Sequence, residues 1–274
     1  MSTPSTSARV GRRQLQAIAD QLDTIDRQLL GLLAAHRYAT TRQLARIISL
    51  TGRYASDRSA LRQTSRRLSR HRQLGLTDHL ERRIGGAKSG STSHVWRLRE
   101  PGHRLTSPDA TVRKRTSEPS YAFLAHTLAI TEARLIIEQA AHHAGGRLTL
   151  LATEPECWRT WHGPAGTTHW LKPDLEAITT TAHGDQDHWL LEIDLGTENP
   201  ARLLAKCHDY QAHLNTGTEQ TLRGYYPQVV WLLNNPDRAT RLTQQITDQT
   251  TFTPGLFKII TSPEELTRLI QNGP

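Results

Sequence analysis

Two carboxylates interrupt an apolar segment near the middle of the second half of the chain. Residues 188–196 read HWLLEIDLG, in which Glu192 and Asp194 stand among leucine and isoleucine. Because side chains alternate across a β-strand, both acids point to the same face. Adjacent acids repel each other and resist burial, so a strand that keeps both is typical of a site that binds a cation.

A third carboxylate belongs with them if the strands pair as expected. Asp174 follows Pro173 in the segment 169–181, which also reads as a strand. If that segment lies antiparallel to 188–196, Asp174 and Glu192 come together. Mg²⁺ binds oxygen ligands and takes one or two carboxylates together with water and substrate phosphate. The sequence therefore predicts that Asp174 and Glu192 hold Mg²⁺, or Mn²⁺ in its place.

The next helix carries a lysine in a position to assist. Lys206 and Tyr210 are spaced i, i+4 beside the apolar stripe that should face the sheet. Lys206 is expected to lean over the strand ends, where it could stabilise a scissile phosphate or orient a water molecule. The competing interpretation is an ordinary ion pair with Glu192 or Asp194. Asp194 could instead cap the turn that follows it, and Tyr210 could hydrogen-bond a carboxylate.

These residues need an α/β scaffold to position them. Residues 121–146 have the apolar spacing of a long helix, on which His126 is interpreted as a core histidine. Alternating segments of strand and helix type follow, and they predict a mixed central sheet with helices on both faces. The expected strands are 147–154, 169–181, 188–196, 226–235 and 256–262, and the expected helices are 200–214, 236–247 and 263–271.

The other half of the chain is strongly basic. Residues 1–120 contain 23 Lys and Arg against 9 Asp and Glu, a net charge of +14, whereas residues 121–274 contain 11 against 17, or −6. Three helices are expected at 24–38, 39–50 and 57–75, the last ended by Gly75, followed by strands 76–84 and 93–100. This order is typical of a winged helix-turn-helix domain.

The third of these helices has an arginine-rich face. The arginines recur every four residues on one arc of the helix, at Arg58, Arg62, Arg66 and Arg70. Together with Lys88 in the glycine-rich joint 85–90, they are expected to bind double-stranded DNA, and most should contact phosphate rather than read bases. The alternative interpretation is a solvated, arginine-rich helix of a protein-interaction domain. His71, His79 and His94 lack metal-site spacing and are expected at the surface.

Composition sets further bounds on the chain. Two cysteines indicate no disulfide framework, and no apolar run reaches the length of a membrane span, so a cytoplasmic protein without a membrane partner is expected. The sequence leaves the oligomeric state open, a homodimer being one option. The expected organisation is a disordered basic arm at 1–23, a winged helix domain at 24–100, a linker at 101–120 and an α/β domain at 121–274.

The acidic motif resembles that of a known nuclease superfamily. Pro173-Asp174 and Glu192-Ile193-Asp194 look like the PD…(D/E)XK motif of PD-(D/E)XK nucleases, except that Asp194 stands where the lysine is usual. Some branches of that superfamily take the lysine from the following helix, and Lys206 would fill that role. The resemblance implies an αβββαβ core and metal-dependent cleavage of DNA, with Asp174, Glu192, Asp194 and Lys206 as the site.

The whole chain is also similar to the replication-relaxation family of actinobacterial mobile elements. The similarity rests on the winged helix segment, 126-HTLAITEAR-134, the Pro-Asp strand, 192-EIDLGTE-198 and the Lys206-x-x-x-Tyr210 spacing. It implies a role in plasmid replication, DNA relaxation or transfer by conjugation. Three hypotheses stay open: a magnesium-dependent endonuclease or nickase, a non-catalytic DNA-binding initiator or regulator, and a relaxase that attacks DNA through a tyrosine such as Tyr225 or Tyr226.

Overall fold

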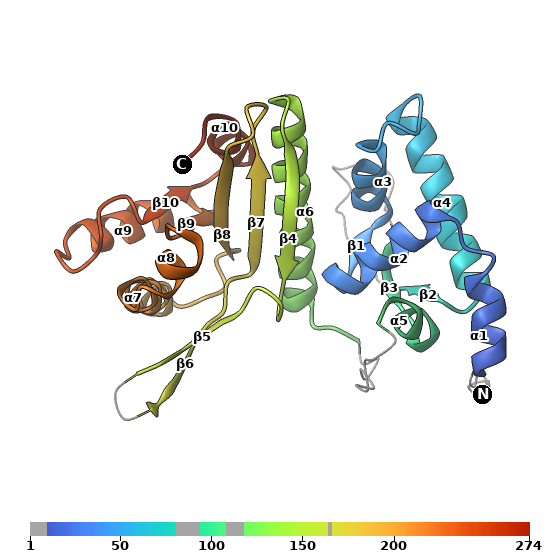
Figure 1. Ribbon diagram of the computed structural model, residues 1–274, viewed down its shortest axis with the longest axis horizontal. Coiled ribbons are helices and arrows are strands. Elements are labelled where there is room, and N and C mark those ends of the chain that lie inside the picture. The colour runs from blue at the N-terminus through green and yellow to red at the C-terminus, as the bar shows by residue number, and fades with distance from the viewer. Residues whose placement is uncertain (1–9, 81–93, 108–117, 164–165) are drawn as a thin grey trace. The chain divides into compact units, whose positions relative to one another are not determined.

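The chain divides into two compact units, Met1–Pro119 and Ser120–Pro274, in the computed structural model (Figure 1). The structure describes residues 10–80, 94–107, 118–163 and 166–274. The fold is mixed α/β, as the sequence predicts. Each unit has its own buried apolar residues.

The first unit is built on helices with well-defined starts. Its helices are α1 (Arg12–Ala19), α2 (Thr24–His36), α3 (Thr41–Ser49), α4 (Asp57–Gln73) and α5 (Glu100–Thr106). Asp23 and Thr40 begin α2 and α3 with capping boxes, in which side chain and backbone bond reciprocally. Gly75 follows α4 with φ of 74°, a left-handed conformation that glycine adopts without strain. The three expected helices of this unit are therefore confirmed.

A small antiparallel sheet completes the first unit. It consists of β1 (Ala39–Thr40), β2 (Thr77–His79) and β3 (Val95–Leu98) in the order β1-β3-β2. The strands are shorter than the sequence predicts, and β1 had no counterpart among the expected elements. The joint 85–90 with Lys88 lies outside the described residues.

Two helices of the first unit correct the expected organisation. The prediction of a disordered arm over 1–23 is wrong for α1, whose Leu15, Ile18 and Ala19 recur at i, i+3 and i+4 and are buried. The prediction of a linker over 101–120 is wrong at its start, where α5 lies. Pro101 sits in the first turn of α5, a position that suits proline because no hydrogen bond is lost there.

The second unit has a five-stranded mixed sheet in the order β10-β9-β8-β7-β4. Its strands are β4 (Arg147–Thr153), β7 (Leu175–Thr180), β8 (Gln186–Asp194), β9 (Gln228–Leu233) and β10 (Phe257–Ile260). β4, β7 and β8 form an antiparallel meander, whereas β9 and β10 run parallel to β8. The expected mixed central sheet is confirmed.

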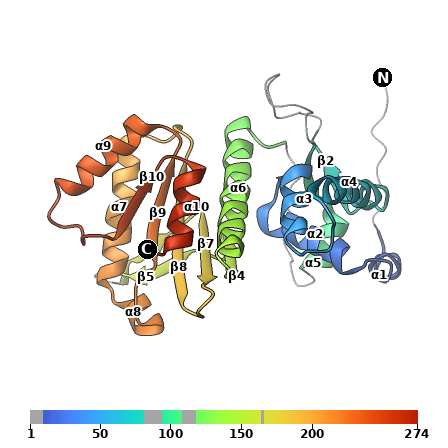
Figure 2. The same ribbon diagram turned by 90° about the horizontal axis from the view of Figure 1, so that it is seen from above.

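Helices cover both faces of this sheet (Figure 2). One face packs on α6 (Tyr121–His143) and α10 (Pro263–Asn272), and the other on α7 (Pro200–Asn215) and α9 (Pro236–Thr247), with α8 (Thr218–Arg223) following α7. Along β8 the side chains alternate as a strand requires. Trp189, Leu191 and Ile193 belong to the α6 and α10 core, whereas Leu190 belongs to the α7 and α9 core.

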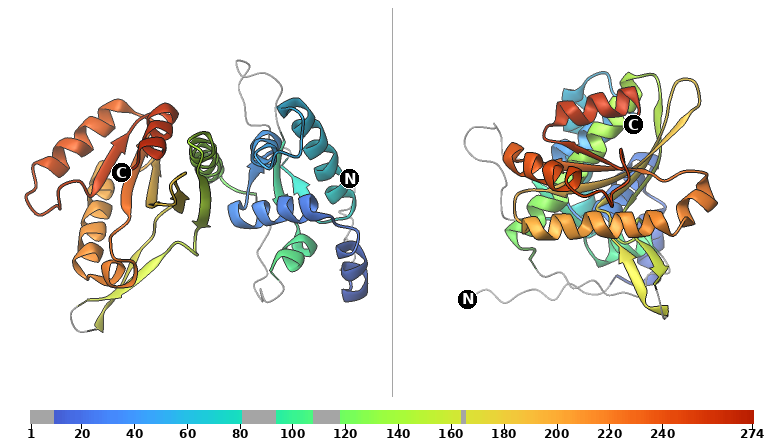
Figure 3. Two further views of the ribbon diagram at one scale, coloured as in Figure 1. Left: turned by 45° about the horizontal axis from the view of Figure 1, so that its top comes forward. Right: turned by 90° about the vertical axis from the view of Figure 1, so that its left-hand side faces the viewer.

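The expected strand 169–181 is in fact two strands. β6 (Thr168–Leu171) pairs with β5 (Arg159–His162) in a separate two-stranded hairpin, and β7 begins only at Leu175. Pro173 lies at the break, because proline has no N–H to give to a sheet ladder. The hairpin extends beyond the edge of the main sheet (Figures 1 and 3).

Candidate functional site

Asp174 and Glu192 lie side by side at neighbouring strand positions. Leu175 pairs with Leu191 across the antiparallel β7–β8 ladder, so the residue before one is opposite the residue after the other. The Asp174 amide donates to the Leu191 carbonyl at 3.0 Å, and the Ile193 amide donates to Asp174 Oδ2 at 2.7 Å. The structure thus brings together the two acids that sequence spacing selected.

Glu192 is completely enclosed and receives two donors from α7. Lys206 Nζ lies 2.8 Å from Oε2, and the Tyr210 hydroxyl donates to Oε1 at 2.8 Å. The side chain is only 1% exposed. Burial raises the pKa of Glu192 to about 8, and the nearby Asp174 adds to this rise, which Lys206 and Tyr210 partly offset. Tyr210, which is also buried, has its pKa raised by burial and by Glu192.

Lys206 therefore stands where both sequence interpretations put it. It forms the ion pair with Glu192, and it projects from α7 over the end of β8 with its side chain 25% exposed. The negative charges of Glu192 and Asp174 outweigh burial and raise the Lys206 pKa, so the ammonium is kept at neutral pH. A cation at this position could contact both a carboxylate and an incoming phosphate.

His126 belongs to the same cluster, a connection the sequence did not reveal. Its Nε2 lies 3.1 Å from Asp174 Oδ1, and its side chain is 36% exposed. The hydrogen bond to Asp174 raises the pKa of His126, and burial opposes that rise. Its interpretation as a core histidine is wrong, because α6 begins close to the strand ends and turns this residue toward the acid.

Asp194 lies on the same face of β8 but has separate partners. Arg238 contacts Asp194 Oδ2 through Nε at 2.7 Å and through Nη2 at 2.6 Å. The Gly196 amide donates a hydrogen bond to Asp194 Oδ1 at 3.0 Å. Asp194 is 2% exposed. Its geometry matches the turn-capping alternative, strengthened by an arginine from α9 that sequence reasoning missed.

The donor set suits an oxygen-seeking divalent ion rather than zinc. Among the contacts of the described residues, each oxygen of Asp174 and Glu192 has one hydrogen-bonding partner, and a carboxylate oxygen can accept a second interaction. Two carboxylates are as many as a Mg²⁺ site usually takes from a protein. Within residues 10–80, 94–107, 118–163 and 166–274, no group of three or more His, Cys, Asp and Glu side chains gathers as a metal cage would require.

A second charged network lies beside this cluster and was not predicted. Arg159 of β5 and Arg223 of α8 both contact Glu176 of β7, at 2.6 and 2.9 Å, and both contact Glu219 of α8. The four side chains come from three segments, β5, β7 and α8. The Glu219–Arg223 pair is local, at i, i+4 on α8, whereas the other contacts join residues far apart in the sequence. Because every charge in it has an opposite partner at hydrogen-bond distance, it reads as a structural clamp between the hairpin, the sheet and α8.

The tyrosine candidates differ in exposure. The Tyr226 hydroxyl lies 3.0 Å from His213 Nδ1, and burial raises the pKa of Tyr226, which makes a phenolate nucleophile harder to form. Tyr225 is 40% exposed and packs edge-on against His188. Neither tyrosine has a hydrogen bond to Asp174 or Glu192 among the contacts of the described residues.

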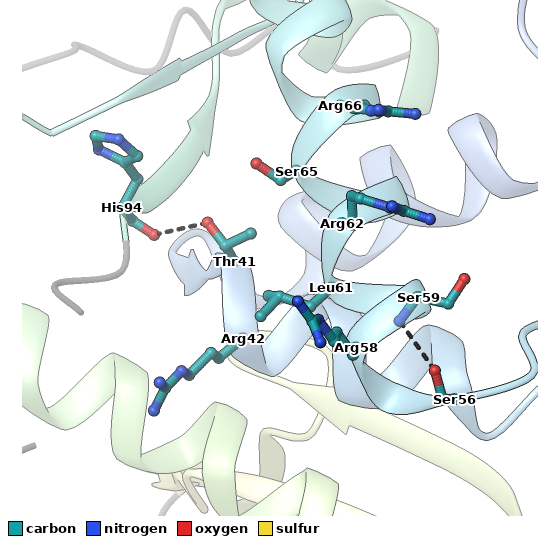
Figure 4. Close-up of a pocket in the computed structure, with 10 residues that line it drawn as sticks. All are labelled: Thr41, Arg42, Ser56, Arg58, Ser59, Leu61, Arg62, Ser65, Arg66 and His94. Atoms are coloured by element: carbon teal, nitrogen blue, oxygen red, sulfur yellow. Dashed lines mark hydrogen bonds between the residues drawn. The ribbon is translucent and has the colours of Figure 1, made fainter. Parts of the chain in front are cut away.

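The predicted arginine face of the first unit separates into two groups. Arg58, Arg62 and Arg66 are exposed and line a groove of about 740 Å³ (Figure 4). Arg62 and Arg66 extend in the same direction from α4 in this view. Arg70 instead contacts Asp26 at 3.3 Å and donates to the Gln21 carbonyl at 3.1 Å. Arg70 therefore does not line the groove, although it lies on the same arc of the helix as the other three arginines.

The groove also contains residues that the sequence did not single out. Arg42 of α3 supplies a further cation, and hydroxyl groups come from several segments, while His94 lies at the start of β3 (Figure 4). The complete lining is Thr41, Arg42, Ser56, Arg58, Ser59, Leu61, Arg62, Ser65, Arg66 and His94. Guanidinium and hydroxyl groups both donate hydrogen bonds, which is the chemistry that recognises phosphate.

Asp26 is the buried counterpart of this exposed face. Arg67 Nη1 lies 2.8 Å from Asp26 Oδ1 and His71 Nε2 lies 3.0 Å from the same atom. His71 is fully buried, so its expected place at the surface is wrong. Burial lowers the pKa of His71, and the positive charges of Arg70 and Arg67 act in the same direction.

Comparison with known proteins identifies a family. The model of the family described as replication-relaxation matches residues 30–229, which include most of the first unit and the cluster around Glu192. No curated protein and no solved structure matches the chain. Among the described residues, none of the helices combines the length and apolar character needed to cross a membrane.

Proposed function

Because the chain belongs to the replication-relaxation family, we propose that it is a DNA-binding protein of a plasmid or other mobile element, which nicks or cleaves DNA with a divalent metal. The proposal rests chiefly on one observation: Asp174, immediately before β7, lies opposite Glu192 of β8, and Lys206 contacts Glu192. The family description supports a role in replication or relaxation, and two neighbouring acids with a lysine support a site that would break the DNA backbone.

The order of elements supports a PD-(D/E)XK-like domain. α6, β4, β7, β8, α7 and β9 follow one another as α-β-β-β-α-β, apart from the inserted hairpin and α8. Asp174 precedes the second strand of this series and Glu192 lies near the end of the third. With Asp194 held by Arg238, Lys206 of the next helix is the cation that takes the place of the usual motif lysine.

The first unit supports binding of double-stranded DNA in the manner of a winged helix. α2, α3 and α4 precede β2 and β3, and Arg58, Arg62 and Arg66 of α4 line the groove with exposed side chains. An arginine-rich helix of this kind enters the major groove, where phosphate contacts position the duplex. Arg42 and the serine hydroxyls of the groove would add to those contacts.

Each side chain of the acidic cluster has a role in the proposed reaction. Asp174 and Glu192 would hold Mg²⁺ or Mn²⁺, and the bound ion would polarise the scissile phosphate and lower the pKa of an attacking water. Tyr210 and the Ile193 amide fix the two carboxylates in place. Lys206, the more exposed partner of Glu192, would turn to the phosphate and neutralise its developing charge.

A second function is favoured by a different observation. Asp194 stands at the usual lysine position and is neutralised by Arg238, and the oxygens of Asp174 and Glu192 already have protein partners. That arrangement also suits a non-catalytic replication initiator or regulator, in which the acidic cluster only stabilises the fold.

Plasmid nicking separates the two functions. Supercoiled plasmid that carries the cognate element is incubated with the full-length protein and Mg²⁺ or Mn²⁺, with EDTA as the metal-free control. The nuclease proposal expects nicked circles with wild type and none with Glu192→Gln, which keeps the shape of the side chain and one of its two accepting oxygens. Glu264→Gln, at an exposed position of α10, is the matched control and should nick normally.

Two outcomes would reject the nuclease proposal. The first is intact duplex binding without nicking in any divalent metal, which would leave the non-catalytic function. The second is nicking by Glu192→Gln at the wild-type rate. Protein that stays covalently attached to the nicked strand would instead indicate the tyrosine route.

A further inference from the structure

The hairpin of β5 and β6 has two very different faces. Thr160 pairs with Trp170 and Trp161 with His169, so alternate residues point to opposite sides. We call the side with Trp158, Thr160, His162, Thr168, Trp170 and Lys172 the outer face, and the other side the inner face.

The inner face fixes the hairpin to the second unit. Leu171 is buried in the α7 and α9 core, and Trp161 packs against the same core. Trp161 also stacks on His169 at 5.2 Å and contacts the ring of His213 on α7 at 5.3 Å. Arg159 joins the clamp with Glu176 and Glu219. The outer face is therefore held in a defined orientation.

The outer face presents aromatic rings and a cation together. Trp170 is 52% exposed, and its ring lies edge-on to Trp158 at 6.0 Å. The Lys172 ammonium lies 4.5 Å from the centre of the Trp158 ring and 5.6 Å from that of Trp170. An exposed tryptophan beside a positioned cation is what a nucleotide needs, because its base can stack on the ring while its phosphate meets the charge.

The position of this face relates it to the acidic cluster. Lys172 is separated from Asp174 by Pro173 alone, at the point where β6 ends and β7 is about to begin. Proline limits the backbone freedom of this connection. The hairpin itself projects past the main sheet (Figure 3). A DNA strand bound at Lys172 would thus lie near Asp174, which follows Lys172 by two residues.

We propose that the outer face of the β5–β6 hairpin binds an unpaired DNA strand, with a base stacked on Trp170 and a phosphate near Lys172. Base faces are hidden in a duplex and free in a single strand, so stacking selects the single strand. The other residues of the outer face, Thr160, His162 and Thr168, are polar and exposed, which suits a hydrated nucleic-acid backbone. This goes beyond the proposed function, because strand binding requires neither metal nor cleavage.

The test measures binding of a fluorescein-labelled 12-mer of thymidine to full-length protein by anisotropy, in EDTA so that nothing is cut. Arg58→Ala/Arg62→Ala/Arg66→Ala serves as the background, which removes binding by the groove of the first unit. Trp170→Ala should weaken binding about tenfold, the effect of losing one stacked base, whereas Trp170→Phe should keep most of it. Leu222→Ala is the control, since Leu222 is another exposed apolar side chain of the same unit.

An abasic oligomer makes the test specific to stacking. It should bind the background protein about as weakly as Trp170→Ala binds the normal oligomer, and Trp170→Ala should weaken abasic binding no further. The proposal is overturned if the background protein binds no single strand, if Trp170→Ala binds like its parent, or if Phe fails to rescue. These results concern binding without metal, so they are independent of the outcome of plasmid nicking.

Discussion

The two units use charge in opposite ways. In the first unit, Arg58, Arg62 and Arg66 are exposed along an open groove. In the second, Glu192 and Asp194 are buried, and each has a cation within 2.8 Å. Exposed charges keep their hydration until a ligand arrives, whereas buried charges are stable only with partners in place.

That difference teaches which substitutions should affect binding and which should affect folding. A groove arginine can be replaced with little cost to the stability of the fold, because its charge is solvated by water. Loss of one partner of a buried pair leaves the other charge without compensation. Arg66 and Arg67 are neighbours in sequence and stand on either side of this division.

The largest effect is expected where Asp194 depends on Arg238. Arg238→Ala removes the cation from an almost fully buried carboxylate that keeps its bond from the Gly196 amide, and it should lower the free energy of unfolding of the second unit by about 3 kcal/mol. Urea denaturation followed by circular dichroism measures this. Arg241→Ala, at an exposed position of the same helix, should change stability by less than about 0.5 kcal/mol. Equal stability of the two variants would show that Asp194 does not depend on Arg238.

The next effect separates Arg67 from Arg66. Arg67→Ala removes the 2.8 Å contact to buried Asp26 and should cost about 2 kcal/mol, since other donors to Asp26 remain. Its duplex affinity per folded molecule should not change. Arg66→Ala should behave in reverse, with normal denaturation and weaker duplex binding. If both variants change the same property, the division between groove and buried network is wrong.

A smaller effect per residue is expected for the groove cations. Each of Arg58→Ala, Arg62→Ala and Arg66→Ala should lower the slope of log affinity against log salt by about 1, as one phosphate contact is lost. Affinity should fall by a similar factor on every duplex sequence. Arg70→Ala, which removes a side chain paired with Asp26, should leave the slope unchanged. Anisotropy titrations over a range of salt concentrations measure this.

The smallest effect is the opposite pH response of two histidines. The folded pKa of His71 is lowered, so its contribution to stability is lost as pH falls below about 6.5. The folded pKa of His126 is raised, so its contribution is complete below about 6.5 and is lost as pH rises through the folded pKa. NMR titration without metal should give midpoints on either side of 6.5, with His71→Gln and His126→Gln to assign the signals. Midpoints on the same side would contradict the account.

Sequence patterns were sufficient wherever the cause is local. Apolar spacing located α2, α3, α4 and α6, and alternation located β8 with its two acids on one face. The pairing of Asp174 with Glu192 followed from one assumption, an antiparallel ladder between neighbouring segments. Lys206 and Tyr210 could be placed because a helix after a strand must return its apolar face to the sheet.

The features that could not be predicted from the sequence depend on contacts between residues far apart in the chain. Arg238 lies 44 residues after Asp194, and Arg67 lies 41 residues after Asp26. The arc of α4 made Arg70 look equivalent to Arg66, although α2 supplies an acid only to the former. The β5–β6 hairpin escaped detection because one strand was expected across the break at Pro173, over 169–181, and none was expected at the position of β5. Such features need the tertiary fold.

Single-turnover nicking of a cognate duplex tests the division between binding and cleavage most directly. Rate is measured against protein concentration in Mg²⁺ for wild type, Glu192→Gln and Arg66→Ala. The account predicts that Arg66→Ala needs more protein yet reaches the wild-type rate at saturation, whereas Glu192→Gln binds normally and does not cut. A Glu192→Gln protein that cuts at the wild-type rate, or an Arg66→Ala protein that stays slow at saturation, would contradict it.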